Sequence, residues 1–136
     1  KLLDFLAPRR PKDGIRILGL TAADISTTKG KHRDWGILGL ATLDGTACVI
    51  SSFRVRRRAK TRKQARERLA KVAVHEIGHT FGLDHCPARG CLMEDAAGSV
   101  LTTDREYDLC NRCIRLLRRA NKPIRRDRQL PWSAPK

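Results

Sequence analysis

Three of the chain's four histidines lie within eleven residues, in the stretch HEIGHTFGLDH at positions 75–85. His75 and His79 are four positions apart, so on a helix their imidazoles lie on one face, about one turn apart. A helix cannot supply a third ligand from that face with good geometry, but Gly82 permits a sharp turn, after which His85 can return from another direction. The spacing therefore predicts one metal ion held by His75, His79 and His85.

Zinc suits this donor set, because three neutral imidazoles leave a fourth position open for water. Such water is deprotonated near neutral pH and can attack a carbonyl that the metal polarises. Glu76 would lie beside the ion, where it can take the proton from that water and pass it to a leaving amine. Histidines satisfied by hydrogen bonds in a core are the alternative, but the HExxHxxGxxH spacing is typical of zinc peptidases and predicts peptide-bond hydrolysis with Glu76 as general base.

Four of the five cysteines form two close pairs downstream of the histidines. Four thiolates from two pairs make a closed structural zinc site, which would hold the loop after His85 against the last predicted helix. Two disulfides or four free thiols are the alternatives. The odd count favours a reducing compartment over a secreted disulfide framework, and Cys48, in a predicted strand, is expected to be a buried apolar residue. The quartet is Cys86, Cys91, Cys110 and Cys113.

A long helix from about Thr61 to Leu83 is expected to carry the first two histidines. Its second half has apolar residues at helical spacing, and Gly82 is suited to end it. Before it, the apolar runs 35–43 and 46–53 are joined by Asp44-Gly45, which predicts an antiparallel hairpin. The apolar residues with helical spacing are Leu69, Val72, Ala73, Ile77 and Phe81.

The remaining segments complete a single α+β domain over residues 1–136, with a small mixed sheet packed on the helix. Residues 1–7 are expected to be the end of a helix, 15–20 a buried strand, and 21–34 a loop. Positions 84–102 predict a long irregular loop. A last helix is expected from Thr103 to Asn121, begun by a Thr103/Glu106 capping box and followed by a basic tail.

The net charge of +15 indicates a polyanionic partner, an acidic substrate or a solvated helix flank. Cations are dense between positions 54 and 71 and in the stretch RLLRRANKPIRRDR near the C-terminus. Aromatic residues make up only 4% of the chain and no nucleic-acid motif appears, so a nucleic-acid partner stays open without being favoured. No apolar run approaches the roughly 18 residues of a membrane span, which excludes a membrane partner.

These motifs together resemble the archaemetzincins, a branch of the metzincin zinc metallopeptidases. The resemblance covers roughly residues 15–120 and rests on HEIGHTFGLDH, CPARGCLM and CNRC, with RILGLTAADI, WGILGLA and ACVISSFR similar to the family's sheet segments. It implies a zincin-like fold, catalytic zinc on the three histidines, and a second, structural zinc on the four cysteines. It also implies that Met93 forms the methionine turn, a hydrophobic floor beneath the catalytic zinc, and that 46–53 is the edge strand beside the cleft.

The resemblance also implies a first strand and a backing helix upstream, of which only KLLDFLA could be a remnant. We therefore expect a longer native protein, and in the present chain a three-stranded sheet with an uncovered face. The missing segment would be an intramolecular partner, and peptides or proteins, acidic ones in particular, would be the substrates. A cytoplasmic, archaeal monomer is expected; a catalytically inactive or nucleic-acid-binding module on the same fold is the alternative.

Overall fold

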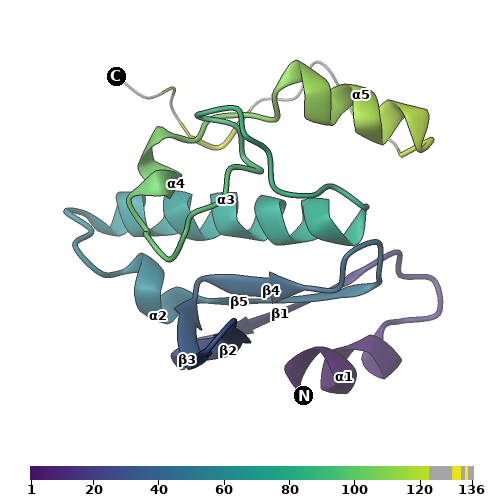
Figure 1. The fold of residues 1–136 in the computed structure, drawn as a ribbon, viewed down its shortest axis with the longest axis horizontal. Coiled ribbons are helices and arrows are strands. Elements are labelled where there is room, and N and C mark those ends of the chain that lie inside the picture. Colours follow the sequence, from purple (N-terminus) through teal and green to yellow (C-terminus); the bar gives the residue numbers. More distant parts are fainter. Residues whose placement is uncertain (123–129, 133, 135–136) are drawn as a thin grey trace.

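A small mixed sheet and the helix packed on it form the frame of the molecule (Figure 1). The structure is a computed structural model that describes residues 1–122, 130–132 and 134. Strand β1 (Ile17–Thr21) runs parallel to β5 (Ala47–Ser51), and β4 (Gly39–Ala41) runs antiparallel to β5, in the order β1-β5-β4. Every residue of the central strand β5 is buried, including Cys48. The predicted three-stranded mixed sheet and the buried Cys48 are both confirmed.

Helix α3 (Arg62–Thr80) lies along one face of this sheet and packs on β4 and β5 (Figure 1). Thr61 begins the helix, because its hydroxyl accepts a hydrogen bond from the Gln64 backbone N–H at 3.0 Å. Beyond the helix, Gly82 has a φ of +87°, a left-handed conformation that glycine adopts without strain. The predicted helix is therefore confirmed, although it ends at Thr80 rather than at Leu83.

The predicted hairpin on either side of Asp44-Gly45 is present, with Leu40 opposite Val49. Asp44 has the expected positive φ, at +49°. The predicted strand lengths were wrong, because 35–37 belongs to a different strand and β5 stops at Ser51. There the Ser51 hydroxyl accepts a hydrogen bond from the Phe53 N–H and so begins the short helix α2 (Ser52–Val55).

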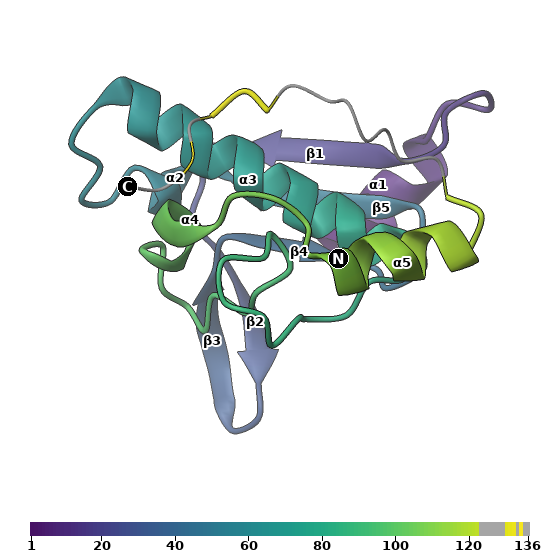
Figure 2. The same cartoon turned by 90° about the horizontal axis from the view of Figure 1, so that it is seen from above.

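Residues 21–34, predicted as a loop, instead contribute to a second, two-stranded sheet. Strand β2 (Ile25–Lys29) pairs antiparallel with β3 (His32–Ile37), with Gly30 at φ +57° in the turn between them. This hairpin projects from the body of the molecule (Figure 2). Most of its side chains are at least partly exposed, so the hairpin has no fully buried face. Its sequence therefore shows none of the apolar alternation that predicts a strand.

The chain after α3 is irregular as far as a short helix, α4 (Thr102–Arg105), and then runs extended to helix α5 (Asn111–Arg119). The single helix predicted from Thr103 to Asn121 is therefore wrong, and so is its capping box: Thr103 donates instead to the Val100 carbonyl, and Glu106 is buried. The extended piece bonds to the preceding loop through Leu92 N–H to Asp108 O and Tyr107 N–H to Gly90 O. Most of the predicted basic tail, 123–129, lies outside the described residues.

Strand β1 is only half buried, contrary to its prediction as a buried strand. Leu18 and Leu20, in an edge strand of the sheet, are exposed at 40% and 64%, whereas Leu6 packs against Gly19 on the other face of the strand, so the face expected to be uncovered is partly covered. Helix α1 (Leu2–Leu6) and the 3-10 turn η1 (Ala7–Arg9) lie across the sheet from α3 (Figure 1). No helix in the described part of the chain is both long and apolar enough to cross a membrane.

Candidate active site

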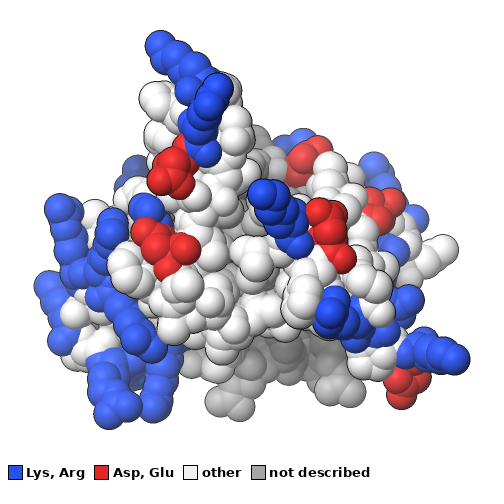
Figure 3. Space-filling model, turned by 90° about the horizontal axis from the view of Figure 1, so that it is seen from below, with Lys and Arg blue, Asp and Glu red and all other residues white. Residues whose placement is uncertain are grey.

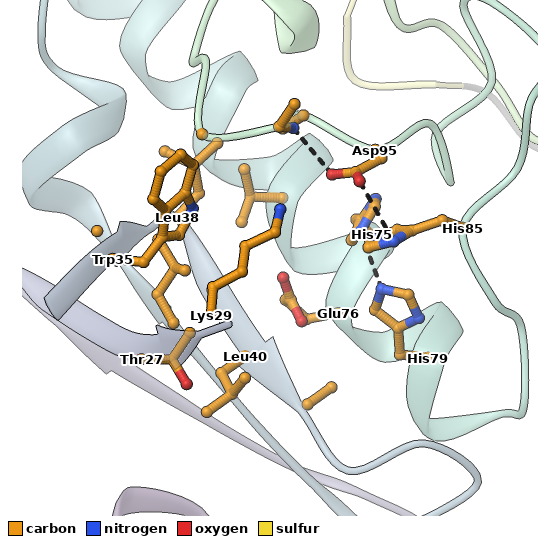
Figure 4. A pocket seen from close by; sticks show the side chains of 18 of the residues that line it. Thr27, Lys29, Trp35, Leu38, Leu40, His75, Glu76, His79, His85 and Asp95 are labelled. Atoms are coloured by element: carbon orange, nitrogen blue, oxygen red, sulfur yellow. Dashed lines mark hydrogen bonds and ion pairs between the residues drawn. The ribbon is translucent and has the colours of Figure 1, made fainter. Parts of the chain in front are cut away.

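The imidazoles of His75 and His79 face each other on the last turns of α3, as their spacing predicts (Figure 4). His75 Nδ1 lies 2.7 Å from the Leu92 carbonyl oxygen, and His79 Nδ1 lies 2.6 Å from that of Leu83. A carbonyl can only accept, so Nδ1 carries the hydrogen in both rings and Nε2 keeps its lone pair. The two Nε2 atoms are 3.0 Å apart, and two lone pairs so close require a cation between them.

Burial strengthens this requirement, because it disfavours a proton as that cation. Burial, with the neighbouring His79, lowers the pKa of His75 to about 4, and burial also lowers the pKa of His79. Both rings are therefore neutral near pH 7, the state in which imidazole binds a metal. The chemistry of the pair fits a divalent ion.

His85 reaches the same point from the loop beyond Gly82 (Figure 4). One ring nitrogen from each of His75, His79 and His85 can be chosen so that all three lie within 4.8 Å of one another. Half of the His85 side chain is exposed, and its Nδ1 lies 3.8 Å from Asp95 Oδ2. The structure thus brings together all three predicted histidines.

The four cysteines of the predicted second site also converge. The Sγ atoms of Cys86 and Cys110 are 3.6 Å apart, and those of Cys91 and Cys113 are 3.7 Å apart. A disulfide would hold its sulfurs at about 2.05 Å, whereas four sulfurs bound tetrahedrally to zinc lie about 3.8 Å from one another. All five cysteines are free, so the alternative of two disulfides is wrong.

Hydrogen bonds among the four thiols and burial give the cysteines different pKa values. Although burial opposes ionisation, hydrogen bonds from the Cys113 backbone and the neighbouring thiols lower the pKa of Cys110 to about 7. Burial and the charge of Cys91 raise the pKa of Cys113. A divalent ion at the centre would favour the thiolate form of all four, so the donor set fits zinc.

Met93 lies beneath helix α3 and is completely buried. Its sulfur would be 2.5 Å from a Cβ at Gly78, so the methionine passes directly under the turn that joins His75 to His79. It packs in one apolar cluster with Leu83 and three of the zinc-site cysteines. The position agrees with the floor that the resemblance implies; its role stays a prediction.

Glu76 lies in a cleft of about 400 Å³ whose lining also includes the three histidines (Figure 4). Its side chain is 6% exposed, and burial raises its pKa to about 8. The carboxyl is held against β4, where a Cβ at Gly39 would lie 2.6 Å from Glu76 Cγ. Residues of β4, and none of β5, line the cleft, so the prediction that 46–53 is the edge strand beside it is wrong.

Comparison with known proteins decides the family. The sequence profile described as peptidase family M54 matches residues 1–119. The chain belongs to peptidase family M54.

Individual M54 relatives agree with this result. Archaemetzincin from Haloquadratum walsbyi is 33% identical over 111 residues, which are 76% of this chain and 62% of that protein. The crystal structure of archaemetzincin from Methanopyrus kandleri superposes with a TM-score of 0.76 at 36% identity, covering 88% of this chain and 63% of that one. A zinc-dependent peptidase from Methanocorpusculum labreanum gives a TM-score of 0.63 at 29% identity, covering 75% and 53%.

The predicted archaemetzincin resemblance and zincin-like fold are thereby confirmed. Membership of M54 and the two donor sets support zinc as the metal. The chain spans about three fifths of the length of the Haloquadratum walsbyi and Methanopyrus kandleri relatives.

Four residues that line the cleft could not be recognised from the sequence as part of the site. Lys29 extends from β2 across the cleft, and its Nζ lies 5.2 Å from the centre of the Trp35 ring on β3 (Figure 4). Asp95 faces His85, and Glu106, 2% exposed, lines the cleft from the segment after α4. Three of the four come from segments predicted as a loop or a helix, so nothing indicated that they would meet the histidines.

Proposed function

We propose that the chain carries the catalytic centre of a zinc-dependent peptidase that hydrolyses peptide bonds. The observation that carries this proposal is the convergence of three histidines beside a buried glutamate in one cleft. His75, His79 and His85 would hold the zinc. When bound, zinc would supply Lewis-acid chemistry, which polarises a carbonyl and makes water a stronger acid.

Glu76 would act as the general base and then as the general acid. Its carboxylate would take a proton from the attacking water and later donate that proton to the leaving amine. Burial raises its pKa to about 8, which favours retention of the transferred proton between the two steps, while a divalent ion held by the histidines would favour the carboxylate that accepts it. Gly39 keeps the carboxyl in place, since any larger residue there would collide with it.

Strand β4 would position the substrate. In the described part of the chain its only strand partner is β5, so its other edge is free along the cleft. An extended peptide could add there as a further strand, and its backbone hydrogen bonds would align the scissile carbonyl with the histidines. Lys29, whose ammonium reaches into the same cleft, supports a preference for peptides with an acidic side chain.

The four cysteines would hold a second, structural zinc, giving two ions per chain. This site would fix the loop that carries His85, because Cys86 follows that histidine directly and Cys110 begins α5. Thiols available for zinc, and no membrane-spanning helix among the described residues, support a cytoplasmic location.

The decisive experiment compares the wild type with Glu76→Gln, both loaded with zinc. Metal analysis should find two zinc ions per chain in each protein, and a mixture of quenched peptides should be cleaved by the wild type alone. Equal hydrolysis by the two proteins would exclude Glu76 as the base. A zinc-loaded wild type that cleaves none of the peptides, although it binds them, would support the inactive-module alternative.

A further inference from the structure

A dense group of cations lies on the surface formed by α2, the loop after it and the start of α3. From Gly45 to Arg66 the chain has no acidic residue. Seven exposed cations of this stretch do not line the cleft, so the proposed peptidase chemistry does not use them. Blue side chains crowd the left side of Figure 3, the side occupied by α2 and the following loop in Figure 1. This α2–α3 basic surface comprises Arg56, Arg57, Arg58, Lys60, Arg62, Lys63 and Arg66.

Six of the seven cations form no ion pair with any described residue. The exception is Lys63, whose side chain is 78% exposed and whose Nζ lies 3.8 Å from Glu67 Oε1, a long and therefore weak pair. A solvated helix flank normally mixes both signs of charge, which limits self-repulsion. Here the charges accumulate instead, producing a local positive potential that attracts a polyanion.

Two of these cations lie at positions where the local structure disfavours them, one because of its backbone conformation and one because of its charge. Arg58 has a φ of +55°, a left-handed conformation that is unfavourable for a residue with a Cβ. Arg62 starts α3, and the first turn of that helix has no acidic residue. Cations at this end oppose the helix dipole, whose positive pole lies there. Positive charge is thus present at two points where stability alone would favour glycine or an acid.

Hydrogen bonds hold the backbone beneath the basic surface in place. The buried Arg68 donates to the Val55 carbonyl at 3.2 Å and to the Arg57 carbonyl at 2.8 Å, while both oxygens of Asp104 accept from the same guanidinium at 2.7 Å. Arg68 therefore ties the loop to α3 and α4. Because the backbone beneath them is fixed, the cations can meet several phosphates at once with little loss of backbone entropy.

We propose that the α2–α3 basic surface binds the phosphodiester backbone of a nucleic acid. Arginines outnumber lysines in the set, and their planar fork suits phosphate oxygens. The adjacent Phe53 is 42% exposed, with the Arg57 guanidinium 5.3 Å from its ring centre, so a base could stack beside the charged groups. The carboxylates of an acidic protein could also bind these guanidinium groups, but they could not stack on the exposed Phe53 ring, so this ring favours nucleic acid.

The test measures binding of fluorescent RNA and DNA oligonucleotides to the zinc-loaded full chain at several salt concentrations. The wild type should bind with a steep salt dependence. The variant Arg56→Gln/Arg58→Gly/Arg62→Gln should bind at least tenfold more weakly at moderate salt and lose about two to three from the slope of log K against log salt. The control Arg112→Gln/Arg115→Gln/Arg118→Gln removes the same charge from exposed positions on α5 and should lose less than twofold.

Equal weakening by the two triple variants would overturn the proposal, because net charge alone would then explain the binding. Tighter binding of a glutamate-rich peptide than of either oligonucleotide would overturn it in favour of an acidic protein. Arg58→Gly alone separates function from folding: relief of the positive φ should leave the Tm equal or higher while the affinity falls. A lower Tm with unchanged affinity would assign Arg58 to folding and count against the proposal.

Discussion

His85 Nδ1 and Asp95 Oδ2 lie 3.8 Å apart, on a loop that also carries the methionine beneath the histidines. The other two histidines are oriented by backbone carbonyls, whereas His85, half exposed, has this carboxylate as its partner. Asp95 is itself held by the Ala97 N–H at 2.8 Å. Because Nδ1 faces the carboxylate, Nε2 would be the atom left for a metal, and Asp95 would position the third ligand.

Replacing Asp95 with Asn should therefore weaken zinc binding while leaving the three histidines in place. Loss of such an outer partner typically lowers metal affinity about 10–100-fold. A competition titration with a zinc chelator would measure the change, which should appear as a lower zinc affinity of the histidine site alone. Asp34→Asn, an exposed substitution on β3 outside the cleft, should leave zinc affinity unaltered; a similar loss in both variants would contradict the assignment.

Gly39→Ala should disable the proposed base without removing the metal. Its Cβ would lie 2.6 Å from Glu76 Cγ and 2.8 Å from Cδ, so the buried carboxyl must move. A displacement of about 1 Å at a catalytic group can reduce turnover by about 100-fold. Peptide turnover should fall by that order while zinc content and circular dichroism stay those of the wild type. Unchanged turnover would mean that the carboxyl adapts at no cost.

Loss of one cysteine of the quartet should affect folding more than chemistry. Cys113→Ser should remove one zinc per chain and lower the Tm by about 10 °C or more, because the binding energy of a structural zinc is folding energy. Metal analysis and calorimetry would measure both effects. Cys48→Ala, at the buried cysteine in β5, should keep two zinc ions even if it lowers the Tm. Two ions retained in Cys113→Ser would exclude the quartet as a zinc site.

Glu106 should make stability depend on pH in a predictable direction. Burial raises its pKa from an ordinary 4.5 to about 8, although the nearby charge of Lys71 opposes the shift. Below about pH 4.5 the carboxyl is neutral whether the chain is folded or unfolded. Between 4.5 and 8 only the unfolded chain ionises, so the contribution of Glu106 to stability is lost as pH rises through this window.

The variant Glu106→Gln removes that titration, so the difference between the two proteins isolates it. Relative to the variant, the wild type should lose up to about 1.4 kcal/mol of unfolding free energy per pH unit between 4.5 and 8. Denaturant titrations at intervals of pH would measure it. The difference should be constant below and above the window. A difference that is flat throughout, or that grows in favour of the wild type, would contradict a raised pKa.

The histidine and cysteine motifs could be predicted from sequence because they depend on local spacing. His75 and His79 share a helical face by periodicity alone, and Gly82 marks the bend before His85. The cleft walls depend on contacts between distant segments, which have no period. Strand β2 is mostly exposed and shows no apolar alternation, so its sequence predicts a loop at Lys29. The helix predicted at Thr103 is interrupted because the chain after Glu106 runs extended and bonds to the distant loop at Gly90 and Leu92, contacts that local spacing does not reveal.

Lys29 should set a preference for acidic peptides, since its ammonium projects into the cleft and forms no ion pair with any described residue. A hydrogen bond to a charged group contributes about 1.5–3 kcal/mol, so Lys29→Met should raise KM roughly tenfold for a peptide with a glutamate near the cleaved bond. The kcat should stay the same, because Lys29 would bind the side chain rather than the reacting carbonyl. Lys31→Met, in the turn of the same hairpin and outside the cleft, should change neither constant. If KM rises equally for the matching glutamine peptide, Lys29 contributes to the shape of the cleft and not to charge selection.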